Sequence, residues 1–278
     1  MLTEFSEQNF NLFRKLIKKE VGVSLRPVKR NMLGLKLAHR LQSLGMSSYL
    51  AYYRYLLKPE GLNELRYLIN IVTIGQTEFF RGTFFFELLR EQIIPEIVSR
   101  NKNSKRIRIW SSGCSTGQEP YSIAMLLEKK AKDGPYWNVK ILATDINTTS
   151  LVTAFTGRYS SKKVASIPSD YLTRYFYKEM IKEEETYRVK DSIKKKILFR
   201  RLNLLRSIHR VNGPVDLICC RNVLIYFDHT ARKKIINNFH HLLSPKCYLC
   251  LGSSESLLGV DNRFHLIGSG VYQKSDEM

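Results

Sequence analysis

Apolar residues recur at helical spacing through the first 75 positions of the chain, as in Phe10, Phe13 and Ile17. Residues three or four positions apart share one face of an α-helix, so each repeat predicts a helix with one buried side. Glycine and proline residues interrupt the repeats and mark the turns between helices. The pattern predicts an all-helical N-terminal domain over residues 1–75.

From residue 107 onward, short apolar runs alternate with helical patterns. This alternation is typical of an α/β domain whose mostly parallel sheet is covered on both faces. We expect this domain to span residues 76–278, with a small inserted β-subdomain at about 158–200 that includes short strands at 187–189 and 197–199. A late strand around Tyr248 is expected to form one arm of a terminal antiparallel hairpin.

A glycine-bearing loop lies between the first predicted strand of this domain and the helix that follows. Residues 106–110 predict the strand, residues 111–117 form the loop, and the helix begins near Glu119 with Pro120 in its first turn. Small residues let the backbone approach a ligand closely, and the free N–H groups of the helix start supply donors. The segment favours a site for a small nucleoside-like ligand, although a tight turn without a ligand would have the same pattern.

The second predicted strand, residues 139–145, ends in Asp145, whose carboxylate can accept two hydrogen bonds from a ribose diol. Dinucleotide folds place such an acid roughly 20 residues beyond a G-x-G-x-x-G motif. Here the glycines are spaced G-x-x-x-G, and Asp145 lies 28 positions after Gly117. The spacing favours S-adenosylmethionine over a nicotinamide dinucleotide.

Composition narrows the class of protein further. The 278 residues carry 45 Lys and Arg against 25 Asp and Glu, a formal charge of +20 that favours encounters with polyanions or acidic protein surfaces. No apolar run approaches the roughly 20 residues of a membrane span, and residues 1–5 do not begin a secretory signal, so we expect a cytoplasmic protein without membrane insertion. Five scattered cysteines do not form a disulfide framework. Cys247 and Cys250 have C-x-x-C spacing within an apolar strand, which favours core packing over a zinc or redox site.

Four further segments combine residue types that bind ligands. Residues 73–81 place aromatic, hydroxyl and guanidinium groups at the seam between the predicted domains, where sites often form. Residues 201–204 follow a strand, and their Asn amide or backbone could hold an adenine edge. Residues 215–227 place polar groups at the carboxyl end of an inner strand, where open α/β sheets bind ligands. Residues 248–256 close a late strand.

Together these segments resemble the CheR-type chemotaxis receptor methyltransferases, which are protein-glutamate O-methyltransferases. The resemblance covers nearly the whole chain and rests on T-x-x-x-T-x-F-F-R (73–81), S-T-G-Q-E-P-Y-S-I-A (115–124), A-T-D-I (143–146), G-R-Y (157–159), N-L (203–204), C-R-N-V-L-I-Y-F (220–227) and L-G-S-S-E-S-L (251–257). It implies a class I S-adenosylmethionine-dependent methyltransferase fold, Rossmann-like, with a terminal antiparallel hairpin, an all-α N-terminal domain and an inserted β-subdomain.

The resemblance also implies site residues. Arg81 and Tyr226 would lie nearest the transferred methyl group as catalytic residues. Contacts to S-adenosylmethionine are implied for Gly75, Thr77, Arg81, Glu119, Asp145, Asn203, Leu204, Cys220 and Arg221. Gly75 stands where the family commonly has Asn, and Ser253 stands in place of a frequent His.

The chemistry of glutamate methylation agrees with these residues. A glutamate carboxylate is ionised at neutral pH, so an in-line displacement on a sulfonium methyl group needs alignment rather than a strong base. We therefore expect no metal and no catalytic histidine. Arg81 can orient a carboxylate and Tyr226 can donate to an acceptor oxygen. Arg81 could instead serve only as an ion-pair partner of Glu78 or Glu119.

Two other functions fit parts of the sequence. A nucleic-acid methyltransferase would explain the charge, but such enzymes usually carry [DN]-P-P-[YF] or a Pro-Cys after the fourth strand, where this chain has Cys-Cys-Arg-Asn at 219–222. We therefore expect no nucleic-acid partner. A non-catalytic adaptor that senses the cofactor would need neither Arg81 nor Tyr226.

The expected partner is the acidic helical cytoplasmic domain of chemoreceptors. The basic N-terminal helices around Lys29, Arg30, Lys36 and Arg40 are suited to dock there. Some family members also bind a peptide at the receptor C-terminus through a glycine-bearing turn of the inserted subdomain. The matching turn here, residues 182–186, has no glycine, which predicts docking without a C-terminal peptide tether.

Overall fold

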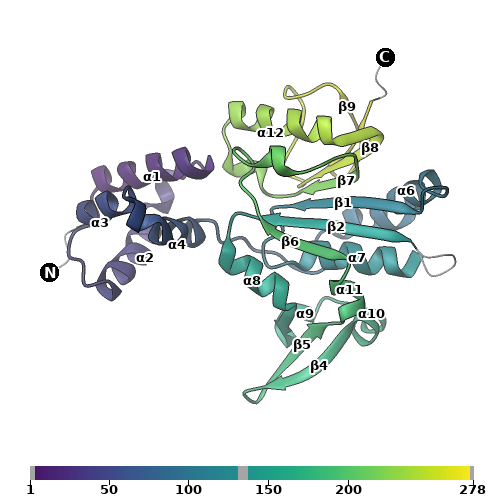
Figure 1. Cartoon of the computed structure of the whole chain (residues 1–278), viewed down its shortest axis with the longest axis horizontal. Helices are drawn as coiled ribbons and strands as arrows, with labels where there is room; N and C mark the ends of the chain where they lie inside the picture. Colours follow the sequence, from purple (N-terminus) through teal and green to yellow (C-terminus); the bar gives the residue numbers. More distant parts are fainter. Residues whose placement is uncertain (1–3, 131–136, 276–278) are drawn as a thin grey trace.

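The computed structural model describes residues 4–130 and 137–275. A cluster of N-terminal helices lies beside an α/β layer structure, and a small separate sheet projects from the same side of the layers as β6 (Figure 1). The carboxyl ends of the central strands point toward the N-terminal helices. The architecture agrees with the predicted class I methyltransferase fold with an all-α N-terminal domain.

The N-terminal cluster contains four α-helices and two 3₁₀ turns within the described residues. Ser6 accepts from Asn9 N–H at 3.2 Å and begins the first helix, which ends at Gly22 in the left-handed conformation. The apolar faces enclose a core that includes the fully buried Phe13 and Tyr52. The helices are α1 (Glu7–Val21), α2 (Arg30–Ser43), α3 (Tyr49–Leu56) and α4 (Leu62–Val72), with turns at Pro27–Lys29 and Pro59–Gly61.

A buried carboxylate ties α2, α3 and α4 together. Glu64 accepts from both the Nε and Nη2 atoms of Arg40, the former at 2.9 Å, and from the Tyr52 hydroxyl at 3.1 Å. Arg40 also stacks over the Tyr67 ring, 4.4 Å from its centroid. The Arg40 hydrogen bonds lower the pKa of Glu64, so this carboxylate stays ionised inside the helical cluster.

Arg40→Met is expected to lower the free energy of unfolding by about 2 kcal/mol at neutral pH, because it leaves Glu64 buried without its cation. The folded-state pKa of Glu64 lies below its ordinary value, so the Arg40 contribution is present above about pH 4.5 and is lost as the pH falls through the lowered pKa. Urea unfolding at pH 7 and at a series of pH values below 4.5 measures both effects. Arg54→Met, at an exposed position of α3, is the control; equal loss in the two variants would contradict the role of Glu64.

The main sheet has seven strands in the order β6-β2-β1-β7-β8-β10-β9. The first five are parallel in their pairings, and β10 pairs antiparallel with both β8 and β9. The strands are β1 (Arg106–Ser112), β2 (Asn138–Asp145), β6 (Ile197–Arg201), β7 (Val215–Cys220), β8 (Leu243–Leu251), β9 (Phe264–Gly268) and β10 (Val271–Lys274). Because β1 and β7 are central, their carboxyl ends lie at the middle of the sheet edge that binds ligands in such folds.

Helices cover both faces of this sheet, and each face has its own apolar core. One core holds Ile109, Ile141 and Tyr121, and the other holds Trp110, Ile218 and Phe239. Successive residues of one strand therefore pack into opposite cores, as Ile109 and Trp110 do. The helices are α5 (Thr83–Leu88), which continues through a π-helical turn (Leu89–Ile93) into α6 (Ile94–Arg100), then α7 (Gln118–Lys130), α8 (Thr148–Thr156) and α12 (His229–Leu242), with 3₁₀ turns at Ile208–Arg210 and Leu224–Tyr226.

The inserted subdomain is a separate three-stranded antiparallel sheet in the order β3-β5-β4. Its strands are β3 (Arg158–Ser160), β4 (Phe176–Ile181) and β5 (Glu184–Val189), joined by α9 (Ser161–Val164) and α10 (Ser169–Tyr175) and followed by α11 (Asp191–Lys194). The strand predicted at 197–199 is wrongly placed in this excursion, because β6 pairs in parallel with β2 and forms the edge of the main sheet. A five-residue strand carries no local signal that distinguishes the two sheets.

A second expectation fails at the C-terminal end. The strand around Tyr248 is not an arm of the terminal hairpin, because β8 is parallel to β7 and the hairpin joins β9 to β10. The prediction for Cys247 and Cys250 is confirmed, since both side chains are fully buried in the cores of the sheet. No helix of the described residues has the length and apolar character needed to cross a bilayer.

Candidate active site

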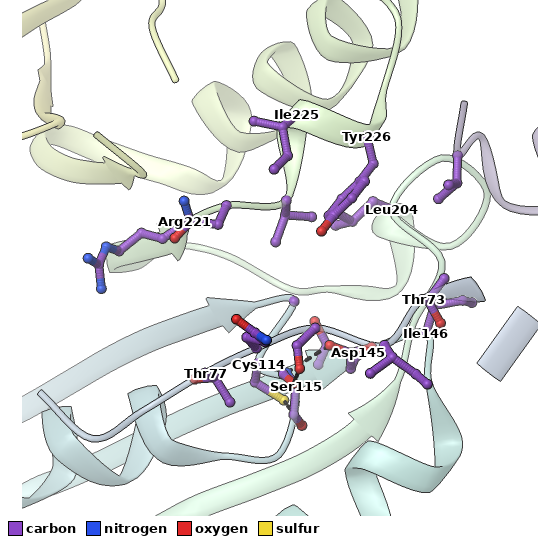
Figure 2. A pocket seen from close by; sticks show the side chains of 18 of the residues that line it. Thr73, Thr77, Cys114, Ser115, Asp145, Ile146, Leu204, Arg221, Ile225 and Tyr226 are labelled. Carbon is purple, nitrogen blue, oxygen red and sulfur yellow. Dashed lines mark hydrogen bonds between the residues drawn. The ribbon is translucent and has the colours of Figure 1, made fainter. Parts of the chain in front are cut away.

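A cavity of about 450 Å³ lies between the N-terminal helices and the carboxyl ends of the parallel strands. Its walls include Val21 and Lys29 from the N-terminal domain and Cys114, Asp145 and Tyr226 from the sheet domain. Figure 2 shows Tyr226 and Leu204 facing Asp145 and Ser115 across this cavity. The volume falls within the roughly 300–1,000 Å³ of small-molecule sites.

The loop after β1 forms the floor of the cavity. The N–H groups of Gly113 and Cys114 donate to the Thr144 carbonyl at 2.7 and 2.9 Å, which joins the ends of β1 and β2. Gly117 has φ of 94°, and a Cβ there would lie 2.8 Å from the Cβ of Ala154 in α8. Glycine is required at this position by both the left-handed backbone and the close approach of α8.

Asp145 lies at the end of β2, as predicted, and lines the cavity. Its two carboxylate oxygens accept from the backbone N–H groups of Ser115 and Asn147, each at 2.8 Å. Burial raises the pKa of Asp145, and the backbone hydrogen bonds from Asn147 and Ser115 oppose that rise. Each oxygen has a second lone pair, so the carboxylate retains acceptor capacity for a diol.

A mostly buried ion pair, with side chains 10% and 14% exposed, lies at one end of the cavity. Arg221 Nη1 lies 3.4 Å from Glu119 Oε2, and Ser111 donates to Glu119 Oε1 at 2.8 Å. The guanidinium stacks on Phe85, 3.9 Å from the ring centroid, and its Nη2 donates to the Arg81 carbonyl at 2.8 Å. The buried Nε–H of Arg221 has no hydrogen-bond partner among the described residues. An unsatisfied buried donor in a cavity wall fits a ligand that brings an acceptor.

Arg81 and Tyr226 both line the cavity, from different elements. Arg81 Nη1 donates to the Gln76 carbonyl at 2.7 Å, and no ion pair joins it to Glu78 or Glu119 in the described structure. The remaining guanidinium donors are thus available for a carboxylate. Tyr226 is 45% exposed, and its backbone carbonyl accepts from Ser24 N–H at 2.8 Å. Its phenol belongs to the cavity while its backbone is anchored to the N-terminal domain.

Asn203 has a structural role that the sequence does not indicate. Its amide donates to the Glu20 carbonyl at 2.8 Å, and its Oδ1 accepts from Leu205 N–H at 3.0 Å. The side chain therefore joins α1 to the sheet domain, and Asn203 and Leu204 both line the cavity. A contact of Asn203 to adenine would use its backbone or the second amide hydrogen.

The remaining predicted residues divide between the cavity and the core. Gly75 and Thr77 line the cavity, and a Cβ at Gly75 would approach only the Ser115 side chain, at 3.5 Å. Cys220 does not line it, because its side chain is fully buried in the core under α12, where burial raises the pKa of its thiol well above the ordinary value. A cofactor contact by the Cys220 side chain would require a rearrangement of that core.

Sequence reasoning missed several residues that shape the cavity. Val21, Val23 and Lys29 reach it from the N-terminal domain, and Glu255 fixes the loop behind its wall. Glu255 lies within the L-G-S-S-E-S-L segment, which could have drawn attention to it. The N-terminal residues carry no such signal, since their position depends on how the two domains pack.

The residues present fit S-adenosylmethionine. Asp145 offers acceptors for a ribose, the start of α7 lies beside the glycine-bearing loop, and Arg221 offers an unused donor. The cavity lining includes no histidine among the described residues, and no group of three His, Cys, Asp or Glu side chains there is arranged to hold a metal ion.

Comparisons with known proteins agree with this geometry. Two family models match the chain: the CheR methyltransferase all-alpha domain over residues 8–73 and the CheR methyltransferase SAM binding domain over residues 75–273. A chemotaxis protein methyltransferase of Borreliella burgdorferi is 33% identical over 94% of this chain and 92% of its own length. The Escherichia coli protein of the same name is 35% identical over 98% and 92%. Chemotaxis protein methyltransferase 2 of Vibrio cholerae is 32% identical over 98% and 96%.

Proposed function

This chain belongs to the CheR methyltransferase family, and from that premise we propose that it converts glutamate side chains of chemoreceptors to methyl esters. The observation that carries the proposal is a single cavity that joins Asp145, suited to a nucleoside, to Arg81 and Tyr226, suited to a carboxylate. S-Adenosylmethionine supplies the methyl group, and S-adenosylhomocysteine is the second product.

The proposed chemistry depends on alignment. Bound S-adenosylmethionine supplies an electrophilic methyl group on its sulfonium. Because the acceptor glutamate is already ionised at neutral pH, no protein group has to remove a proton. Arg81, whose guanidinium is free of ion pairs in the described structure, would hold the acceptor carboxylate or the carboxylate of the cofactor. Tyr226 would donate a hydrogen bond to an acceptor oxygen and fix its direction of approach.

The ion pair of Arg221 and Glu119 supports this site from one end. The Arg221 guanidinium contacts Glu119, the Arg81 carbonyl and the Phe85 ring, so its position is fixed before any ligand binds. The Arg221 bond to the Arg81 backbone also fixes the point from which the Arg81 side chain extends. Preorganised groups of this kind lose little entropy on binding, which favours affinity.

One assay separates the proposed reaction from its two alternatives. The protein is incubated with methyl-labelled S-adenosylmethionine and, in parallel, with receptor cytoplasmic fragments or RNA. Label that appears on the receptor fragment and is released by mild base identifies glutamate esters. Base-stable label on RNA would replace the proposal with a nucleic-acid methyltransferase, and cofactor binding without transfer to either would replace it with an adaptor.

We also propose that the N-terminal helices dock the receptor, with a smaller set of residues than the sequence indicates. Arg40 forms an ion pair with Glu64 inside the helical cluster, and Lys36 Nζ donates to the Ile71 carbonyl at 2.8 Å. Burial and the nearby Lys29 lower the pKa of Lys36. Lys29 is exposed and lines the mouth of the cavity, and the partly exposed Arg30 follows it at the start of α2. Lys29 and Arg30 are therefore the docking cations that we propose.

Docking without a C-terminal peptide tether remains part of this proposal. The turn between β4 and β5 consists of Lys182 and Glu183, with φ of 50° and 66°. Two consecutive left-handed residues make a tight hairpin turn, a position that usually favours glycine or asparagine. The absence of glycine from this turn supports docking through the N-terminal helices instead.

Charge reversal tests this docking model. Methylation of a receptor fragment at limiting concentration is expected to fall about tenfold between low and physiological salt, because screening shortens the range of attraction to about 8 Å. At low salt, replacing Lys29 and Arg30 with Glu should lower methylation of the fragment relative to the parent protein. Removing the last residues of the receptor should have no effect.

The matched control replaces Lys102 and Arg106 with Glu, because these exposed cations lie at the opposite end of the sheet from the cavity. This pair changes the net charge equally and should leave methylation nearly unchanged. Loss of activity on removal of the receptor C-terminus, without salt dependence, would show that the inserted subdomain recruits the substrate.

A further inference from the structure

A buried carboxylate lies behind the cavity wall, in the loop that follows β8. Glu255 is 8% exposed and is not among the residues that line the cavity. Its Oε2 accepts from the backbone N–H groups of Gly252 and Asn222, each at 2.7 Å, and its Oε1 accepts from Ile225 N–H at 3.2 Å. One side chain thus satisfies three backbone donors, and two of them, at Asn222 and Ile225, lie 33 and 30 positions from Glu255 in sequence.

Two of these donors belong to the segment that carries Tyr226. Asn222 has φ of 60°, a left-handed conformation that asparagine adopts more readily than most other residues, and its N–H donates to Glu255 from that conformation. Ile225 immediately precedes Tyr226 within the 3₁₀ turn Leu224–Tyr226. The carboxylate therefore holds both ends of the short chain that joins β7 to Tyr226.

The packing around this carboxylate is close. A Cβ added to Gly252 would lie 2.8 Å from Glu255 Oε2 and 2.7 Å from the side-chain Nδ2 of Asn222. The two loops therefore leave no room for a side chain at Gly252. On its other side, Tyr226 is anchored through its carbonyl to Ser24 N–H at 2.8 Å.

We propose that Glu255 is a positioning residue for methyl transfer, which acts by fixing the backbone of residues 222–226 so that the Tyr226 phenol meets the acceptor carboxylate. The inference rests on the proposed function. Charged acceptors of backbone N–H groups make strong hydrogen bonds, and three together restrict the loop to one conformation. Glu255 itself contacts neither substrate nor cofactor. Its influence on the rate passes through Tyr226.

The test uses Glu255→Gln in the full-length protein. An amide keeps one oxygen but places an NH₂ group against at least one of the three backbone donors. The matched control is Asp216→Asn, because Asp216 also accepts a backbone N–H, from Arg108 at 2.7 Å, but at the opposite end of β7. Glu255→Asp, which keeps the charge with a shorter side chain, is the second variant if Glu255→Gln folds poorly.

Glu255→Gln should lower kcat about tenfold and leave the cofactor Kd within about twofold, whereas Asp216→Asn should change neither. Amide exchange at Asn222 and Ile225 should accelerate in Glu255→Gln alone. In a Tyr226→Phe background, Glu255→Gln should lower kcat by less than about twofold, because both changes remove the same alignment.

Several outcomes would overturn the inference. An active parent enzyme whose kcat is unchanged by Glu255→Gln would remove Glu255 from the mechanism and leave the proposed function standing. Full additivity with Tyr226→Phe would show a structural contribution that does not pass through Tyr226. A parent enzyme that methylates no receptor fragment would overturn the proposed function and this role together.

Discussion

Asp145→Ala is expected to weaken S-adenosylmethionine binding at least about tenfold, because it would remove the two partly charge-assisted hydrogen bonds that we propose to the ribose, of roughly 1.5–3 kcal/mol each. The carboxylate already accepts from Ser115 and Asn147, so it is held in one orientation before the ligand binds. The backbone N–H of Ile146 also contributes a hydrogen bond that favours the ionised carboxylate. Isothermal titration calorimetry with the cofactor measures the change.

The same substitution also removes the acceptor of two backbone N–H groups, so thermal unfolding has to be measured beside affinity. Asp145→Asn separates the two effects, since the amide retains one acceptor oxygen and should lose less affinity than Ala. Glu128→Gln is the control for loss of a carboxylate, because Glu128 lies near the C-terminal end of α7, in an ion pair with Lys196. Unchanged cofactor binding by a folded Asp145→Ala protein would remove Asp145 from the site.

Tyr226→Phe is expected to lower turnover about tenfold or more while cofactor affinity stays within about twofold, because the lost hydrogen bond matters mainly in the transition state. The phenol is nearly half exposed at the cavity and makes no hydrogen bond in the described structure that its removal would break. Stability should therefore hold. Single-turnover methylation of a saturating receptor fragment measures the rate.

Tyr272→Phe provides the control. Tyr272 is a buried tyrosine, and its hydroxyl accepts from Leu257 N–H at 3.4 Å, two residues after Glu255. It should affect stability more than rate. Equal turnover by Tyr226→Phe and the parent enzyme would exclude Tyr226 from the mechanism. A matching loss in both variants would assign the effect to packing of the C-terminal strands.

Periodicity along the chain was sufficient to predict the N-terminal helices and the strand that ends in Asp145. Helical spacing of large apolar residues predicts α1 to α4, because each helix buries one face and the pattern lies within the segment itself. The run that ends in Asp145 predicts both a buried strand and its polar end. Asp145 could therefore be placed at the cavity from sequence, since parallel strands present their carboxyl ends at one edge of the sheet.

Side-chain partners that lie far apart in sequence could not be predicted in this way. Arg40 and Asn203 look like surface or ligand-binding residues in the sequence, yet Glu64 holds the first and the Glu20 carbonyl holds the second. Nothing in the local pattern indicates these partners. The docking cations that we propose are therefore fewer than the basic residues of the helices.

The sequence alone determined the two-domain fold class, the parallel sheet and the place of Asp145 at the carboxyl edge of that sheet, because these depend on local propensity and on the period of apolar positions. Only the tertiary structure decided that β6 joins the main sheet, that the Cys220 side chain enters the core and that Glu255 supports the Tyr226 loop. Each of these depends on a contact between distant segments, and such contacts are set by packing geometry that residue spacing does not encode.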